Sequence, residues 1–259
     1  MSEYHYAQNY VDKFKWNRPN ATEKIYVCLP KEVIHTNSSL NAVADFPYLS
    51  EREQDSIIAS LTEILDKIND SIFLQQFTES MLYTIGKIRT PIVIVENESQ
   101  LPKADSNHFV LNVVQLEAEE FLENSRSSFS TNMGNYYAYD YTLRHFSTNA
   151  WFKFDQPDTS IYFKNNEVAE NFQGVVTSIK DMKATLKGHF DRINVNNAYQ
   201  SARDLGAYCG QLYIEQILHT YVRRFTGGNQ YYMYYNIDGE YVETMIPYAE
   251  GMKDSFEKI

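Results

Sequence analysis

The amino-acid sequence predicts an α+β protein of two or three layers, in which a mixed, mostly antiparallel sheet is covered by two long amphipathic helices. Two stretches, 51–87 and 196–225, place apolar residues three and four positions apart, as amphipathic helices do. Between them, short apolar runs and a long aromatic segment are typical of β-strands. No repeat and no Pro-rich or Gly/Ser-rich linker divides the 259 residues, so we expect a single domain over 1–259.

The first quarter of the chain predicts a lead-in segment and one buried strand. Residues 1–20 are polar and rich in aromatics, and Tyr6, Tyr10 and Phe14 recur every four residues, as in a short docking helix. The apolar run 25–29 ends at a proline, which indicates a buried strand. Residues 33–49 are expected to be irregular.

The first long helix has a clear start. Ser50 and Glu53 have the spacing of a capping box, in which each side chain bonds the backbone of the other residue. The apolar periodicity then runs to about residue 87, and we expect a break near Asn69–Asp70 and an end at Gly86. A second short buried strand follows over 91–95.

The middle of the chain predicts an antiparallel meander of three strands. The first covers 108–116 and could continue to Phe121, and the last covers 160–172 after a turn at 156–158. Between them, the strand over 136–154 is longer than usual, so it should contain a bulge or bend.

Residues 174–195 fit either a hairpin that turns at 180–183 or a continuous helix; β-branched residues and Gly188 favour the hairpin. A clear helical pattern then occupies 196–225. A last hairpin is predicted where residues 231–236 and 240–245 flank Asp238–Gly239, a dipeptide that favours a tight turn. Residues 246–259 are expected to form a charged, flexible tail.

Composition limits the classes of partner. The formal charge of −11 and the scattered basic residues argue against nucleic acid, which is bound through clustered Lys and Arg. No apolar run approaches the ~20 residues that cross a bilayer, so we expect no membrane span.

Cys28 and Cys209 lack metal-type spacing, and two buried thiols are expected, although a disulfide between them stays open.

Tyrosine is the unusual feature of the composition, with 21 residues, several of them in runs. Tyr has an apolar ring and a hydrogen-bonding tip, so such runs suit strand faces and also binding surfaces. Strand packing is the plainer interpretation. The binding interpretation gives a candidate aromatic surface of Tyr136, Tyr139, Tyr231 and Tyr234.

Other candidate sites have an ordinary structural explanation. Ala198, Ala202, Gly206 and Gly210 recur every fourth residue, which predicts a close helix packing more than a ligand cleft. His189 and Asp191, and the adjacent Glu119 and Glu120, could be acid–base or glycosidase pairs, but such spacings are common by chance. The six histidines form no metal motif, so neither a metal nor a cofactor is expected.

The order of elements carries a resemblance. A short strand ending in Leu-Pro, a long helix, a second strand, an aromatic meander and a helix containing AYQSARDLG at 198–206 resemble uncharacterised Bacteroidetes cell-envelope lipoproteins. Some of these are similar in layout to TolB-N-like or CsgG-like α/β domains. The resemblance implies an accessory protein of the periplasm or outer membrane, with a lipid anchor in the native form. The chain has no lipobox cysteine, and Met1-Ser2-Glu3 starts no signal peptide, so a cytoplasmic location is the alternative.

The sequence lacks GxSxG, P-loop and GxGxxG motifs, which favours a function other than catalysis. We therefore expect a non-enzymatic binding protein of the cell envelope whose partner is a protein or a glycan. Two alternatives stay open: a hydrolase whose site is assembled only in the fold, and a structural subunit of a larger assembly. Oligomeric state does not follow from the sequence.

Overall fold

The computed structural model describes most of the chain between residues 22 and 226 and three short strands beyond it. The described residues are 22–42, 50–103, 108–154, 161–181, 183–226, 231–232, 246–247 and 257–258. The lead-in 1–20, the turn at 156–158, the turn of the last hairpin and most of the predicted tail lie outside them.

A mixed sheet forms the centre of the molecule, in the strand order β11-β6-β5-β4-β1-β3. Its antiparallel part is the predicted meander of β4, β5 and β6, while β1 runs parallel to both β3 and β4. The strands are β1 (Lys24–Cys28), β2 (Ile34–Asn37), β3 (Ile92–Val95), β4 (His108–Ser130), β5 (Tyr136–Phe154), β6 (Tyr162–Ala169) and β11 (Glu257–Lys258).

The edge of β4 that faces β1 is paired in two separate stretches. β1 pairs with β4 up to Cys28–Asn112, and β2 resumes the parallel pairing at Ile34–Glu117. Between them the chain leaves the sheet over residues 29–33, opposite a bulge in β4 at Val114. A bulge leaves one residue unpaired and redirects its side chain, so the sheet is interrupted at this point.

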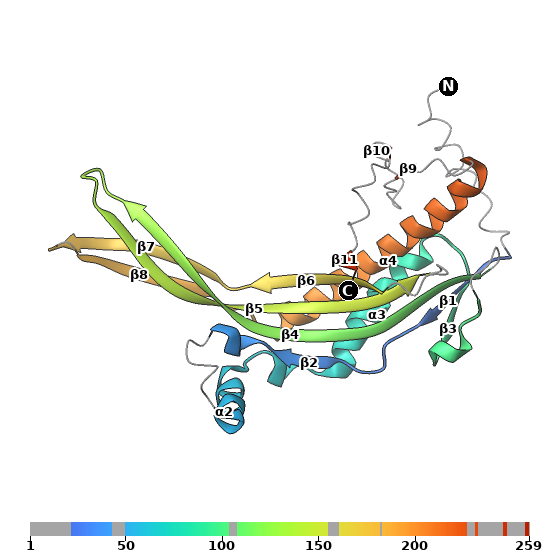
Figure 1. Cartoon of the computed structure of the whole chain (residues 1–259), viewed down its shortest axis with the longest axis horizontal. Coiled ribbons are helices and arrows are strands. Elements are labelled where there is room, and N and C mark those ends of the chain that lie inside the picture. The colour runs from blue at the N-terminus through green and yellow to red at the C-terminus, as the bar shows by residue number, and fades with distance from the viewer. Residues whose placement is uncertain are drawn as a thin grey trace.

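Two helices, α3 (Asp70–Gly86) and α4 (Val195–Thr226), lie side by side across one face of the sheet (Figure 1). Their apolar side chains form one core with the strands; Phe73 meets Phe146 edge-on at 6.2 Å, and Tyr213 stacks on Phe154 at 5.4 Å. The shorter α2 (Glu51–Leu61) and the 3-10 turns Ser39–Ala42, Leu65–Lys67 and Glu98–Gln100 complete the body. The α+β class and the covered sheet are as predicted.

Two β ribbons extend from the body away from α3 and α4 (Figure 1). The first arm is the part of β4 and β5 over residues 121–144, beyond the pairing of β2 with β4 and of β6 with β5. The second arm is the hairpin of β7 (Asn171–Lys180) and β8 (Lys183–Asp191), a separate two-stranded sheet. The hairpin predicted over 174–195 is therefore confirmed.

Several predicted boundaries need correction. Residues 33–49 contain β2 and a 3-10 turn where irregular structure was expected, because β2 is held by pairing with β4 and not by its own apolar content. The strand predicted over 160–172 is divided at Glu170 between β6 and β7. The strand predicted over 108–116 runs on to Ser130 as β4, and the expected bulge lies in this strand, not in its partner over 136–154.

The helix boundaries follow the capping signals. Ser50 donates hydrogen bonds to the Glu53 carboxylate through its N–H at 2.9 Å and its hydroxyl at 2.6 Å. The helix predicted over 51–87 is broken over residues 62–69, a wider gap than the break expected near Asn69–Asp70, and the Asn69 side chain caps α3 by accepting from the N–H of Ile72. Near the C-terminus, β9 (Tyr231–Tyr232) pairs antiparallel with β10 (Ile246–Pro247). No helix in the described part of the chain is long and apolar enough to span a membrane.

Candidate functional site

The predicted tyrosine surface is divided between two faces of the first arm. Tyr136 is 67% exposed near the tip of the arm, whereas Tyr139 points to the opposite face of β5, because side chains alternate along a strand. Tyr231 lies in β9 with a side chain outside the described atoms, and Tyr234 is not among the described residues. The structure thus does not bring Tyr136 and Tyr139 onto one face.

Tyr139 instead belongs to an aromatic cluster that joins the two arms. Its ring centroid lies 5.8 Å from that of Tyr141 and 5.8 Å from that of Phe172 in the second arm. Phe172 also lies 4.8 Å from Tyr141 and 4.7 Å from Phe190. Contacts of this kind stabilise by area burial and by ring geometry together, so these aromatics hold the arms to one another.

The outer parts of both arms expose apolar side chains. Met133 and Tyr136 at the end of the first arm are 90% and 67% exposed, and Val175 in the second arm is 63% exposed. Ile179, near the turn of the second arm, is also exposed. An exposed apolar side chain is ordinary when isolated, but here four of them lie on two projecting ribbons.

One face of the second arm carries three lysines. Cross-strand pairing puts Lys180 opposite Lys183 and Val175 opposite Lys187, and alternation places all four side chains on one face. Within the described residues these lysines form no ion pair, although the whole chain has a formal charge of −11. Like charges opposite each other destabilise a hairpin, so this face is suited to an acidic partner.

A buried carboxylate fixes the helical layer to the sheet. Glu120 in β4 is fully buried and accepts hydrogen bonds of 2.9–3.1 Å from the N–H groups of Glu63, Ile64 and Leu65. The Arg144 guanidinium donates to the same carboxylate and lies 3.0 Å from Glu63 Oε2. Glu119, the neighbour of Glu120 in sequence, points to the opposite face of β4 and bonds Ser38 and Asn149. The two carboxylates therefore cannot act together on one substrate.

The buried His145 lies between two carboxylates on the sheet face opposite the helices. Its Nδ1 contacts Glu167, and its Nε2 lies 3.2 Å from Glu123 Oε2. The nearby Ser147 hydroxyl donates to Asn149 Oδ1, so His145 does not reach it as a base. His189 and Asp191 lie 3.3 Å apart, but both are exposed on the second arm. No group of three or more potential ligands that could hold a metal occurs among the described residues.

The small-residue stripe of α4 is a packing surface, as predicted. Ala198 and Ala202 are fully buried, and a Cβ on Gly210 would lie 2.8 Å from the carbonyl oxygen of Met81 in α3. Cys28 and Cys209 are both buried and free. Burial raises the pKa of the Cys209 thiol to about 12.

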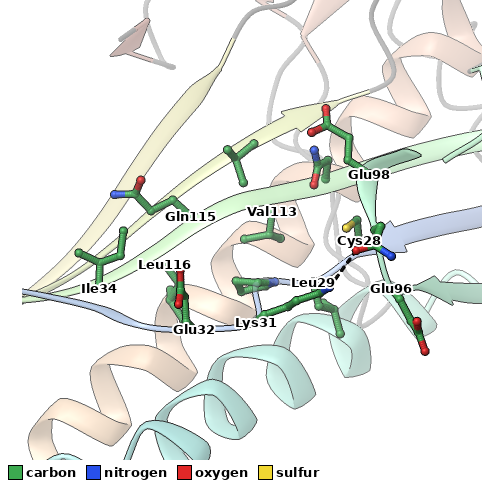
Figure 2. A pocket seen from close by; sticks show the side chains of 14 residues that line it. Cys28, Leu29, Lys31, Glu32, Ile34, Glu96, Glu98, Val113, Gln115 and Leu116 are labelled. Atoms are coloured by element: carbon green, nitrogen blue, oxygen red, sulfur yellow. Dashed lines mark hydrogen bonds between the residues drawn. The ribbon is translucent and has the colours of Figure 1, made fainter. Parts of the chain in front are cut away.

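The interrupted edge of β4 borders a pocket of about 400 Å³ (Figure 2). It lies where β1 and β3 end, and its lining comes from the segments after both strands and from β4 around the bulge. The carboxyl ends of neighbouring parallel strands are a common place for ligands in sheets with helices on their faces. Lys31 spans the pocket wall and donates to Asn97 Oδ1 at 2.9 Å, as the dashed line in Figure 2 shows.

The buried amide of this pocket, Asn112, was not among the predicted site residues. Asn112 interrupts the apolar run from Phe109 to Val114, and it is only 5% exposed. An amide within a buried strand is a usable signal, because buried polar groups normally have a hydrogen-bonding role. Whether this amide lines a pocket depends on where residues 29–33 leave the sheet, and no local sequence pattern predicts that.

Comparisons with known proteins give little further guidance. No family model matches the chain, and no curated protein matches its sequence. Among solved structures, a Helicobacter pylori protein described as a neuraminyllactose-binding hemagglutinin homolog aligns with 80% of this chain and 85% of its own, at 10% identity and a TM-score of 0.23. A TM-score this low does not establish a shared fold.

Proposed function

We propose that this chain is a non-enzymatic binding protein that holds a protein partner through its two arms. The observation that carries the proposal is the collection of exposed apolar side chains, Met133, Tyr136, Val175 and Ile179, on the two ribbons that leave the body. Two-stranded ribbons are marginally stable alone in water, and a free strand edge is a template for another chain. A partner that covers the arms would stabilise the two ribbons and cover their free strand edges.

The charge of the second arm favours a protein over a glycan as the partner. On the face that carries Val175, Lys187 lies directly opposite it, and Lys180 and Lys183 follow toward the turn, so the partner surface is expected to carry an apolar group next to acidic groups. A neutral glycan would leave the lysines unmatched. Such a contact should form faster at low salt, because charge complementarity acts mainly on the rate of association.

The cell envelope is the proposed location, and a lipid anchor in the native form is part of that proposal. Its support is the order of elements that resembles the Bacteroidetes envelope lipoproteins. Fractionation of cells that produce the full-length gene product tests it: recovery in the cytoplasm alone would contradict an envelope location.

The direct test is a capture experiment with paired variants. The wild-type chain and Val175→Ser/Ile179→Ser and Met133→Ser/Tyr136→Ser double variants are immobilised and exposed to envelope extract, and bound proteins are identified by mass spectrometry. We expect one partner that both double variants lose and that Tyr83→Ser, an exposed position in α3, retains. A partner retained by both arm variants would contradict the proposal.

A second candidate function, a subunit of a larger assembly, follows from the same exposed side chains if the partner is another copy. Light scattering coupled to size-exclusion chromatography decides between the two. A multiple of the 30.2 kDa chain mass that the arm variants reduce to a monomer indicates an assembly. A monomer at every concentration leaves the binding function with a different partner.

A further inference from the structure

We infer that the pocket beside the β4 bulge binds a short peptide segment of neutral or positive charge, independently of the arms. The residues that carry the inference all line the pocket: the amides Asn112 and Gln115, and the exposed aliphatic side chains of Ile34 and Val114. The proposed partner surface does not use this pocket, and of its lining residues Val113 and Leu116 belong to the core.

Asn112 is the observation that points to a ligand. Its side chain is 95% buried and lines the pocket, yet it makes no hydrogen bond to any part of the chain that the structure describes. A carboxamide offers two donors and an accepting oxygen, and with no partner from the described chain they are open to solvent or to a ligand in the pocket. A ligand group with a matching donor and acceptor would supply the missing partners.

Asn149 gives the internal comparison. It lies on the same sheet face as Asn112 and is equally buried, at 5% exposure. Its amide donates to Glu117 at 3.1 Å and Glu119 at 3.0 Å, and its oxygen accepts from Ser147 at 2.8 Å. The fold therefore satisfies one of these two buried amides and leaves the other open toward a pocket.

The backbone around the pocket leaves room for the ligand. No backbone hydrogen bond connects residues 29–33 to residues 113–116 of β4 in the described structure, and Pro30 has no N–H to offer. Val114 at the bulge and Ile34 at the start of β2 both line the pocket, and both are exposed. A lining with aliphatic side chains and two amides fits a peptide group carrying an aliphatic side chain.

The charge of the lining selects against anions. Glu32, Glu96 and Glu98 face one cation, Lys31, which makes a formal lining charge of −2. Glu98 is held 3.2 Å from Lys153, so part of the negative charge is matched, but no surplus of positive charge is available for a phosphate or a carboxylate. The lining contains no aromatic ring on which a sugar could stack.

The test is an NMR saturation-transfer titration with defined probes. Acetylated, amidated tripeptides with the central residues lysine, serine and glutamate between two valines are compared with N-acetylglucosamine and inorganic phosphate, each to about 5 mM. We expect saturable binding of the lysine and serine peptides and binding of the glutamate peptide that is about tenfold weaker. Saturation by none of the peptides, or by the sugar or phosphate instead, would overturn the inference.

Two variants locate the binding and separate it from folding. Asn112→Leu removes the amide at similar volume, and Val114→Trp fills the rim; each should weaken peptide binding by about tenfold or more. Because Asn112 has no partner to lose, Asn112→Leu should keep the melting temperature, whereas Asn149→Leu should lower it by several degrees. Unchanged peptide binding in both pocket variants, or a loss of melting temperature in Asn112→Leu equal to that in Asn149→Leu, would contradict a ligand site.

The arms provide the control for independence. The Val175→Ser/Ile179→Ser variant should bind the peptides as the wild type does, even if it loses its protein partner. Conversely, Asn112→Leu should retain a partner captured by the arms. Loss of peptide binding in the arm variant would overturn the statement that this pocket acts on its own.

Discussion

Gly206 of α4 lies directly against the backbone of Phe77 in α3: a Cβ added to Gly206 would overlap the Phe77 carbonyl oxygen. One turn further on, a Cβ on Gly210 would meet the Met81 carbonyl oxygen and the Thr84 side chain. The two helices therefore approach each other through their backbones, and the side chains of Phe73 and Phe77 can reach the sheet beneath them.

Gly206→Ala should destabilise the protein because the added methyl group meets backbone that cannot rotate away. Overpacking of this kind costs about 1–3 kcal/mol, and the better helix propensity of alanine offsets about 1 kcal/mol of it. We expect a net loss of up to roughly 2 kcal/mol in urea unfolding. Gly86→Ala is the control: nothing lies within 4 Å of its Cβ, so its stability should be unchanged or slightly higher. Equal stability of the two variants would show that α3 and α4 are not this close.

Glu120→Ala should be among the most damaging substitutions in the chain. It leaves the N–H groups of Glu63, Ile64 and Leu65 without their acceptor and Arg144 without its buried counter-charge. Removing one member of a buried ion pair costs about 3–5 kcal/mol. Glu63→Ala removes only the half-exposed partner of Arg144 and should cost less than about 1 kcal/mol. Chemical denaturation of both variants checks the difference, and similar losses would contradict a dominant role for Glu120.

The strength of the local signal decides how much of this structure can be predicted from sequence. The capping pair Ser50–Glu53 and the four-residue spacing of Ala198 to Gly210 are local signals. The packing stripe is confirmed, and the capping box is confirmed in its Ser50 N–H to Glu53 half, while the Ser50 hydroxyl donates to the Glu53 carboxylate. β2 has little apolar content of its own and forms because β4 pairs with it. Its residues carry no local strand pattern, and the segment was therefore predicted to be irregular.

The candidate sites depend even more on long-range placement. Glu120 and Arg144 meet across two strands, and the pocket around Asn112 needs β1, β3 and β4 in register. The tyrosine run at 136–141 was correctly assigned to a strand, but its place on a projecting arm depends on where β6 stops pairing with β5. No residue spacing in the sequence predicts where the pairing of β6 with β5 ends.

Phe172→Ala should release the second arm from the first while the body of the protein stays folded. The Phe172 ring contacts Tyr139, Tyr141 and Phe190, and Gly188 lies directly beneath it. Truncating a packed phenylalanine costs about 3–5 kcal/mol, which exceeds what a two-stranded ribbon supplies alone. Hydrogen exchange should therefore speed up over residues 171–191 but not in α3. Unchanged exchange in the arm would contradict the joining role of the cluster.

Cys209 should resist alkylation in the folded protein. Burial raises the pKa of its thiol from 9.0 to about 12, so very little of the reactive thiolate exists at pH 8. Iodoacetamide should modify it roughly a thousandfold more slowly than an unhindered thiol, and the rate should rise about tenfold for each pH unit while the protein stays folded.

Cys28 is the internal control for this measurement, because it lies in the same chain and lines the open pocket. Burial and, after it, the Glu98 carboxylate also raise the pKa of Cys28, so it should react more slowly than a free thiol but before Cys209. Because the Cys209 thiol ionises near pH 9 in the unfolded chain and only near 12 in the folded one, its contribution to stability is complete below pH 9. That contribution should be lost as the pH rises from about 9 to 12. Peptide mapping by mass spectrometry follows both thiols, and modification of Cys209 ahead of Cys28 would show that α4 opens more readily than its packing implies.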